Sequence, residues 1–380
     1  MATGEFGFDA SPDRRGSDSM KWSRYAAAGD DVIGAWVADM DFLPPEPVRQ
    51  AVAERLQSSA AGYAELSPEL VAILIERLNR LYSWRVEADW IVDLSGVVPG
   101  LFGCVRAFDG AVITQSPNYY HFFGAAQYSD RALLRVDNHR VGGRWEMDFD
   151  QIAAHAASGA SCFLLCNPHN PVGRVLERRE LETVAEYCLR NDVFICSDEI
   201  HADLVLDEDK SHLPIASLAP EIAQKSITLL SPSKAFNLVG IGTFAAAIVP
   251  DAQVRERFRR SLFGVSSHPS VLAQVAAMSA YRDCEDWLLA LRQYLRENRD
   301  RVEGVVSGIP GLEMTHVEAT YLAWIDVSKL GLENPFQHFL DHGVALSDGE
   351  PMGDTSHLRL NFACTRENLE EILARIQSAL

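Results

Sequence analysis

The sequence predicts an α/β protein in which a large domain with a mainly parallel, doubly wound sheet precedes a smaller α+β domain. Short apolar runs alternate with helical stretches over roughly 200 residues, and such alternation is typical of βαβ units. Several of these runs are apolar throughout, as expected for strands that helices cover on both faces of a sheet. Near residue 280 the pattern changes to one long helix, short strands and a last helix. These observations place the large domain at residues 46–280 and the small domain at 281–380.

The first 45 residues are expected to form an irregular arm that packs with the small domain. Prolines at positions 44, 45 and 47 punctuate the end of this arm. Two helices are predicted next, over residues 45–59 and 67–84, because Pro in the first and Ser-Pro-Glu in the second are helix start signals.

The remaining elements follow from runs rich in apolar and β-branched residues. Strands of the large sheet are predicted within "AVITQSP" (111–117), "ALLRV" (132–136), "SCFLLCNP" (161–168), "VFICSDEI" (193–200), "SITLLSPS" (226–233) and "TFAAAIV" (243–249). In the small domain we expect a long amphipathic helix over 283–309, strands within 321–327, 344–349 and 358–364, and a last helix over 366–380.

Composition excludes some classes of partner. The formal net charge is −19, spread along the chain, whereas nucleic acids and anionic membranes bind basic faces. The seven cysteines form no CxxC pair and mostly lie in apolar company, which favours buried thiols in a reducing compartment. No apolar run approaches the ~18 residues of a membrane span, and the N-terminus lacks the apolar core of a signal peptide. We therefore expect a cytoplasmic protein that binds neither nucleic acid nor membrane.

Four segments are expected to place polar or charged residues at the ends of apolar strands. The carboxyl ends of strands in open α/β sheets line the ligand crevice. The segments are "CNPHNPVGR" with Asn167 and Asn170, "ICSDEIHADL" with Asp198 and His201, "SPSKAFN" with Lys234, and "LRLNFAC" with Arg359. Any one of them has an ordinary structural explanation, such as a turn, a helix cap or a surface ion pair. All four in this order are hard to explain as coincidence.

The order and spacing of Asn170, Asp198, Lys234 and Arg359 resemble those of the fold-type I pyridoxal 5′-phosphate (PLP) enzymes, in the class I/II aminotransferase group. Within that group the sequence is similar to the MalY/PatB-type cystathionine β-lyases, also called C–S lyases. The similar segments are "KWSRY", "WVADMDF", "GVVPGL", "NPHNPVGR", "SDEIHADL", "SPSKAFNLVG", "EATYLAWID" and "LRLNFAC". The resemblance thus extends from residue 21 to the C-terminus and implies the PLP-transferase fold.

The resemblance implies PLP as cofactor and assigns roles around its ring. Lys234 would bind PLP covalently and then act as general base, since one amine can serve both purposes in turn. Asp198 would keep the ring nitrogen protonated, with His201 beside the cofactor. Asn170 would donate to the phenolic oxygen and contact the substrate. Arg359 would hold the substrate α-carboxylate through its guanidinium fork.

Further residues are implied for the ring face and the phosphate. Tyr119 in "SPNYYHFF" would stack on the ring, and Tyr120 is the alternative candidate for this role. Together with Lys234 and Asp198, Tyr119 would be a catalytic residue. The phosphate would lie at a helix start, where the backbone N–H groups of Val97 and Val98 and the helix dipole suit an anion. The hydroxyl groups of Ser231 and Ser233 would add donors.

Two segments are expected to complete the site. Tyr63 in "AGYAEL" resembles a tyrosine that reaches the phosphate of a neighbouring subunit, which implies a homodimer with shared active sites. Trp36 and Ala38 in "WVADMDF" would contact the substrate, because this loop enters the site in relatives.

Two positions favour a lyase. His201 stands where many transaminases of the group carry Tyr, and Gly242 stands where many carry a phosphate-binding Arg. The expected reaction is α,β-elimination from cystathionine or another cysteine S-conjugate, giving a thiol, pyruvate and ammonia. An aminotransferase, or an enzyme that decarboxylates or oxidises a cysteine S-conjugate, remains the alternative. A regulatory PLP-binding protein is disfavoured by the retained Lys234, Asp198 and Arg359.

The sequence also departs from the branch at two places. "PNYYHFF" replaces a segment that usually reads like "PVYPPF", and Met352-Gly353 replaces a Phe-Gly pair. Both places lie near the expected position of the substrate side chain. We therefore expect either an unusual cysteine S-conjugate as substrate or a changed fate of the substrate after activation of its Cα. No metal is expected, because His338 and His342 lack an obvious third ligand.

Overall fold

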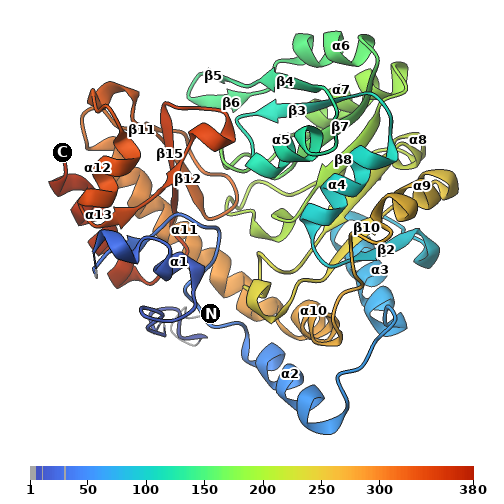
Figure 1. The fold of residues 1–380 in the computed structure, drawn as a ribbon, viewed down its shortest axis with the longest axis horizontal. Coiled ribbons are helices and arrows are strands. Elements are labelled where there is room, and N and C mark those ends of the chain that lie inside the picture. The colour runs from blue at the N-terminus through green and yellow to red at the C-terminus, as the bar shows by residue number, and fades with distance from the viewer. Residues whose placement is uncertain (1–5, 11, 30) are drawn as a thin grey trace.

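The computed structural model describes residues 6–10, 12–29 and 31–380, so residues 1–5, 11 and 30 of the expected arm lie outside the described residues. The chain forms a large part around one sheet and a smaller part that contains the C-terminus (Figure 1). The central sheet is mainly parallel and helices cover it, which confirms the predicted fold class.

The large sheet has seven strands in the order β2-β10-β9-β8-β7-β3-β4. β10 runs antiparallel to both of its neighbours, and the other neighbouring strands pair in parallel. The strands are β2 (Ile91–Leu94), β3 (Ala111–Ser116), β4 (Leu133–Asp137), β7 (Ala160–Cys166), β8 (Phe194–Asp198), β9 (Ser226–Leu230) and β10 (Ala245–Ile248). A short hairpin of β5 (His139–Val141) and β6 (Arg144–Glu146) lies outside this sheet.

Helices cover both faces of the large sheet, which explains strands that are apolar throughout. On β7, Cys162 and Leu164 join one core cluster, whereas Phe163 and Leu165 join the other. The first cluster contains side chains of α4 (Val97–Ala107), α5 (Tyr120–Gln127) and α9 (Ala252–Leu262). The second contains side chains of α6 (Phe149–Ala157), α7 (Arg178–Arg190) and α8 (Pro220–Gln224).

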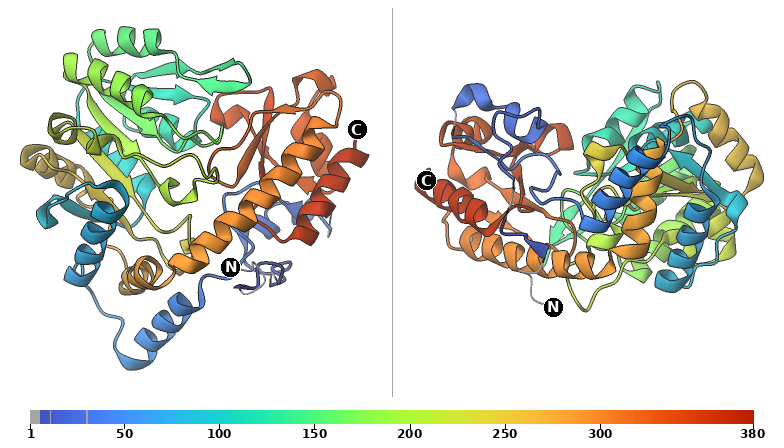
Figure 2. Two further views of the ribbon diagram at one scale, coloured as in Figure 1. Left: turned by 180° about the vertical axis from the view of Figure 1, so that it is seen from behind. Right: turned by 90° about the horizontal axis from the view of Figure 1, so that it is seen from below.

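Three helices pack together beside the large sheet, and a fourth leads to the small part. α2 (Glu46–Ser58) and α3 (Pro68–Tyr82) both contact α10 (Val271–Asp283). The long helix α11 (Glu285–Ser307) runs from the large part to the small one (Figure 2). Within the described residues, no helix combines the length and the apolar character that a membrane crossing needs.

The small part is built on an antiparallel sheet in the order β11-β12-β15-β14. Its elements are β11 (Glu313–Met314), β12 (Leu322–Asp326), α12 (Pro335–Asp341), β13 (Val344–Ala345), β14 (Ser347–Asp348), β15 (His357–Asn361) and α13 (Arg366–Ser378). Helix α11 packs against α13 and β12.

The N-terminal arm contacts the small part. It contains α1 (Met20–Ser23) and β1 (Ile33–Gly34), and β1 pairs in parallel with β13. The buried ring of Phe8 lies against Trp287 and Tyr294 of α11, with centroids 5.5 and 5.4 Å apart. The domain boundaries at residues 45 and 280 stay a prediction.

Candidate active site

The carboxyl ends of three adjacent parallel strands bring the expected site residues together. Asn170 follows β7, Asp198 ends β8, and Lys234 follows β9, and these strands are neighbours in the sheet. One expectation was wrong: Arg359 does not end a strand but lies in the middle of β15, between Leu358 and Leu360. Its side chain can reach the site because alternate residues of a strand point to opposite faces.

Lys234 carries an amine of lowered basicity. Burial and the nearby Arg359 lower the pKa of Lys234 to about 8, against the opposing effect of Asp39 and Asp198. Its Nζ donates a hydrogen bond to the Ala38 carbonyl oxygen at 2.7 Å. A neutral amine is the nucleophilic and basic form, so this environment increases its reactive fraction near neutral pH.

Asp198 is a buried carboxyl that forms no ion pair within 4 Å among the described residues. Burial raises the pKa of Asp198 to about 7, helped by Glu199, while the Ile200 N–H and Lys234 act in the other direction. The Ile200 N–H donates to its Oδ1 at 3.0 Å. Such a carboxyl ionises more readily when a positive charge is placed beside it.

Arg359 is buried and joins several parts of the site. Its Nη1 donates to Asn170 Oδ1 at 3.0 Å, and its Nη2 donates to the Trp36 carbonyl at 3.0 Å and to Ser347 Oγ at 3.2 Å. Its Nε is buried without a hydrogen-bond partner among the described residues. Burial lowers the pKa of Arg359 to about 10. Asn170 and Arg359 are therefore in direct contact, as a shared substrate contact would require.

His201 and Tyr119 both interact electrostatically with Arg359. Burial, together with Lys234 and Arg359, lowers the pKa of His201 to about 3, and its Nδ1 is buried with no partner in the described structure. Tyr119 immediately precedes α5, and its ring centroid is 4.7 Å from that of Tyr120. Burial raises the pKa of the Tyr119 phenol, and both Arg359 and Asp198 interact with it.

The start of α4 has the backbone arrangement that the expected anion site requires. Val97 and Val98 are its first two residues, so their N–H groups have no acceptor within the helix. Gly96 precedes them with φ of +154°, a conformation that favours glycine. Ser231 Oγ donates to the Phe244 carbonyl at 2.6 Å and lies 2.9 Å from Ser233 Oγ.

Sequence reasoning missed three polar residues at the site. Thr243 donates through its hydroxyl to the Ser95 carbonyl at the start of α4. Tyr321 donates to the Ala38 carbonyl at 3.2 Å, and Ser347 accepts from Arg359. The segment "EATYLAWID" pointed to Tyr321, whereas Ser347 was detectable only through the register of β14 and β15.

Trp36 and Ala38 contribute backbone carbonyls to the site. Their oxygen atoms accept from Arg359 and Lys234, respectively. The indole of Trp36 lies under the Arg24 guanidinium, 5.0 Å from the ring centroid. Tyr63 does not join the site of its own chain: it is fully exposed in the connection between α2 and α3, which projects from the body (Figure 1).

Residues 31–376 match the family model described as aminotransferase class I and II. The chain belongs to this family. Cystathionine β-lyase PatB of Bacillus subtilis (strain 168) is 33% identical over 390 residues, which cover 98% of this chain and 99% of PatB.

Two solved structures extend the comparison. The crystal structure of OvoB aligns with a TM-score of 0.95 at 41% identity, over 99% of each chain. The PLP-bound C–S lyase from Staphylococcus hominis aligns with a TM-score of 0.91 at 31% identity, over 99% of this chain and 98% of that one. The family and the fold that the sequence motifs predicted are therefore confirmed.

Proposed function

We propose that this protein is a PLP-dependent C–S β-lyase, which converts a cysteine S-conjugate and water into a thiol, pyruvate and ammonia. The observation that carries the proposal is the group of Lys234, Asp198 and Arg359, in which an amine of lowered pKa faces a carboxyl and a guanidinium. Relatives of nearly the same length are named cystathionine β-lyase or C–S lyase. Cystathionine is itself a cysteine S-conjugate and would give homocysteine as the thiol.

The residues of the site fit PLP. The buried Nδ1 of His201 has no partner among the described residues, and the start of α4 with the Ser231 and Ser233 hydroxyls suits a phosphate. The Asp198 carboxyl would ionise beside a protonated ring nitrogen, because the two charges stabilise each other. When bound, PLP supplies an electron sink for the negative charge that develops at the substrate Cα.

The chain's own residues would bind the substrate and move its proton. The Arg359 fork would hold the α-carboxylate, with Asn170 beside it. The amine of Lys234 would take the proton from Cα, since a pKa of about 8 leaves roughly a tenth of it neutral at pH 7. The surrounding burial would keep water from this step.

Gly242 supports elimination over transamination, the main alternative within the family. Its φ of +113° is a conformation that an arginine would adopt only with strain. An added Cβ would also lie 3.2 Å from Ser270 Oγ. The phosphate would therefore be held without the arginine that many transaminases use here.

The two segments that depart from the branch meet each other in space, which supports an unusual substrate side chain. The Asn118 N–H donates to the Met352 carbonyl at 3.0 Å, next to Tyr119. Buried Met352 also places its Sδ 3.6 Å from Arg359 Nη1. Both segments would border a substrate whose carboxylate Arg359 holds, so together they would select its side chain.

A homodimer would complete the site. Tyr63 is a large aromatic residue that is fully exposed on a projecting segment, and Leu56 on α2 is also exposed. Exposed apolar side chains on a projecting segment are typical of an interface. Tyr63 would then reach the phosphate of the neighbouring subunit. All seven cysteines are free and buried, which supports a cytoplasmic location.

The test is turnover without a keto acid. The purified protein with PLP is incubated with cystathionine and with S-substituted cysteines of increasing size, and pyruvate, thiol and carbon dioxide are measured. We expect equal amounts of pyruvate and thiol, and faster turnover of a bulky S-conjugate than of cystathionine. Lys234→Ala should lower the rate by at least about 10³-fold. Lys225→Ala, which replaces a half-buried lysine that contacts Asp192, should not.

Other outcomes would contradict the proposal. A requirement for a keto acid would indicate an aminotransferase, and carbon dioxide in place of pyruvate would indicate a decarboxylase. If cystathionine is turned over faster than the other compounds of the series, the prediction of an unusual substrate is wrong and the proposed lyase activity stands.

A further inference from the structure

Residues 36–42, here called the active-site segment, have no regular secondary structure but a dense set of side-chain contacts. From Trp36 to Met40, every backbone carbonyl accepts a hydrogen bond from a side chain. The donors are Arg359 and Ser347 to Trp36, Asn361 to Val37, Lys234 and Tyr321 to Ala38, Asn361 and Lys21 to Asp39, and Asn237 and Arg14 to Met40. The position of this segment is therefore set by side chains from distant parts of the chain.

The active-site segment links the two cations of the site. Lys234 Nζ lies 2.7 Å from the Ala38 oxygen, and Arg359 Nη2 lies 3.0 Å from the Trp36 oxygen, two residues earlier. A shift of this segment would move both acceptors together. Its placement thus bears on the amine and on the guanidinium at once.

Lys21 of the N-terminal arm holds the active-site segment at both ends. Its side chain is completely buried, and its Nζ lies 3.0 Å from Asp41 Oδ2 and 3.1 Å from the Asp39 carbonyl. Its own carbonyl accepts from Trp36 Nε1 at 3.0 Å. A Cβ on Gly34 would lie 2.2 Å from that carbonyl oxygen, so the two backbones approach closely here.

A buried ion pair of this kind needs an explanation other than stability. Removing two charges from water costs free energy that their attraction often only offsets, and apolar replacements of such pairs are often neutral or stabilising. The Lys21–Asp41 pair also gives the active-site segment a fixed direction, because the ammonium contacts a carboxylate and a carbonyl two residues apart.

We propose that Lys21 is a positioning residue of the active site, which fixes the active-site segment so that its Trp36 and Ala38 carbonyls hold Arg359 and the free amine of Lys234. This inference rests on the proposed function for the roles of those two cations. Lys21 itself contacts neither of them.

The test compares wild type with Lys21→Met, which keeps the length of the side chain and removes its charge. We expect amides of residues 36–42 to exchange hydrogen at least about tenfold faster. The KM for the amino-acid substrate should rise about tenfold with a smaller loss in kcat, because Arg359 loses its support. Lys225→Met, which removes a half-buried lysine paired with Asp192, should change neither quantity.

A third readout concerns the pH at which PLP binds covalently to Lys234, followed by absorbance. The groups that face this amine are Asp39, Asp198, His201 and Arg359. Water entering a loosened site would return the Lys234 pKa toward its usual value of 10.5. The midpoint of covalent binding should therefore move up by roughly 1 pH unit.

If Lys21→Met does not fold, Asp41→Asn tests the same ion pair from its other member. It keeps the size of the side chain and an acceptor oxygen, and should change the exchange rate, KM and midpoint in the same direction by less. Unchanged hydrogen exchange and an unchanged midpoint in a folded variant of either kind would overturn the inference. If these two readouts change while no S-conjugate is cleaved, the proposed function fails and the positioning role of Lys21 stands.

Discussion

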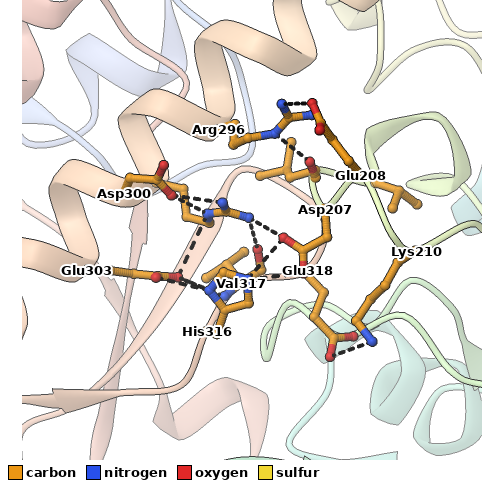
Figure 3. A network of polar contacts seen from close by, with 12 residues as sticks. Asp207, Glu208, Lys210, Arg296, Asp300, Glu303, His316, Val317 and Glu318 are labelled. Atoms are coloured by element: carbon orange, nitrogen blue, oxygen red, sulfur yellow. Dashed lines mark hydrogen bonds and ion pairs between the residues drawn. The ribbon is translucent and has the colours of Figure 1, made fainter.

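Two of the junctions between the large and small parts differ in how far water reaches them. The inner junction is the active-site segment with Lys234 and Arg359. The outer junction surrounds Asp207, which follows β8 and binds Arg299 of α11 at 2.5 Å and His316 at 3.0 Å (Figure 3). Glu303 contacts the other nitrogen of His316 at 3.0 Å, and this histidine side chain is 48% exposed.

The difference teaches that burial, more than the count of neighbouring charges, decides how a cation behaves. At the inner junction burial lowers the pKa of Lys234 to about 8 and that of Arg359 to about 10. At the outer junction the hydrogen bond from His316 to Glu303 is the largest effect, and with Asp207 it raises the pKa of His316 to about 9. Burial therefore disfavours the charged forms of Lys234 and Arg359, whereas Glu303 and Asp207 favour the charged form of His316.

Of the substitutions that test this difference, Asp198→Asn should have the largest effect, which is on the free energy of unfolding. The folded-state pKa of about 7 lies above the usual value of 3.8, so ionisation is penalised in the folded protein and stability falls as pH rises from about 4 to 7. Without PLP, the variant should be more stable than wild type by about 2–4 kcal/mol at pH 8 and similar at pH 4. Denaturant unfolding at the two pH values measures this.

The same substitution at the outer junction is the matched control. Asp207→Asn should destabilise the protein, because Arg299 and His316 lose their shared carboxylate. In the presence of PLP, Asp198→Asn should also weaken cofactor binding, since the ring nitrogen loses its counter-charge. A destabilised Asp198→Asn protein without PLP would show that the carboxyl is not penalised, and the inner junction would then behave like the outer one.

Arg359→Lys should give an intermediate effect. Lysine keeps the charge but lacks the planar fork that spans Asn170, the Trp36 carbonyl and a substrate carboxylate. We expect kcat/KM to fall about 10- to 100-fold, mainly through KM.

Arg299→Lys is the corresponding change at the outer junction, where the steady-state parameters should stay within about twofold. Steady-state kinetics of Arg359→Lys and Arg299→Lys, measured on the same S-conjugate, show whether the two junctions differ in this respect. A similar rise in KM in the two variants would mean that the outer junction also sets the site geometry.

The sequence predicted the residues that the large part contributes to the inner junction better than those that the small part contributes. Apolar runs ending in Asp198 and before Lys234 identify parallel strands, and parallel strands bring their carboxyl ends to one edge. Arg359 lies mid-strand, and the reach of its side chain depends on pairing with Trp324 and Ser347, which local pattern does not reveal. The antiparallel direction of β10 was also hidden, because a strand buried on both faces is apolar in either direction.

The active-site segment was the least predictable feature. Its shape depends on contacts such as Lys234 with Ala38, 196 residues apart, and Arg359 with Trp36, 323 residues apart. The burial of Lys21 could not be predicted either, because a lysine is rarely fully buried unless it is paired, and its partner Asp41 is distant in the sequence.

His316→Gln should give the smallest effect. The folded-state pKa of about 9 lies above the usual value of 6.5, so the stabilisation by the charged histidine is fully present below about pH 6.5 and is lost as pH rises through about 9. We expect wild type to exceed the variant by less than about 1 kcal/mol at pH 6, since water screens a half-exposed pair, and to match it at pH 9.5.

Urea unfolding at the two pH values, with and without 0.5 M salt, measures the difference. Salt should reduce the difference at pH 6, because Asp207 and Glu303 act on His316 through water-accessible contacts. A difference that persists at pH 9.5 or resists salt would mean that the outer junction is dry. The contrast between the two junctions would then have to come from the arrangement of their charges rather than from water.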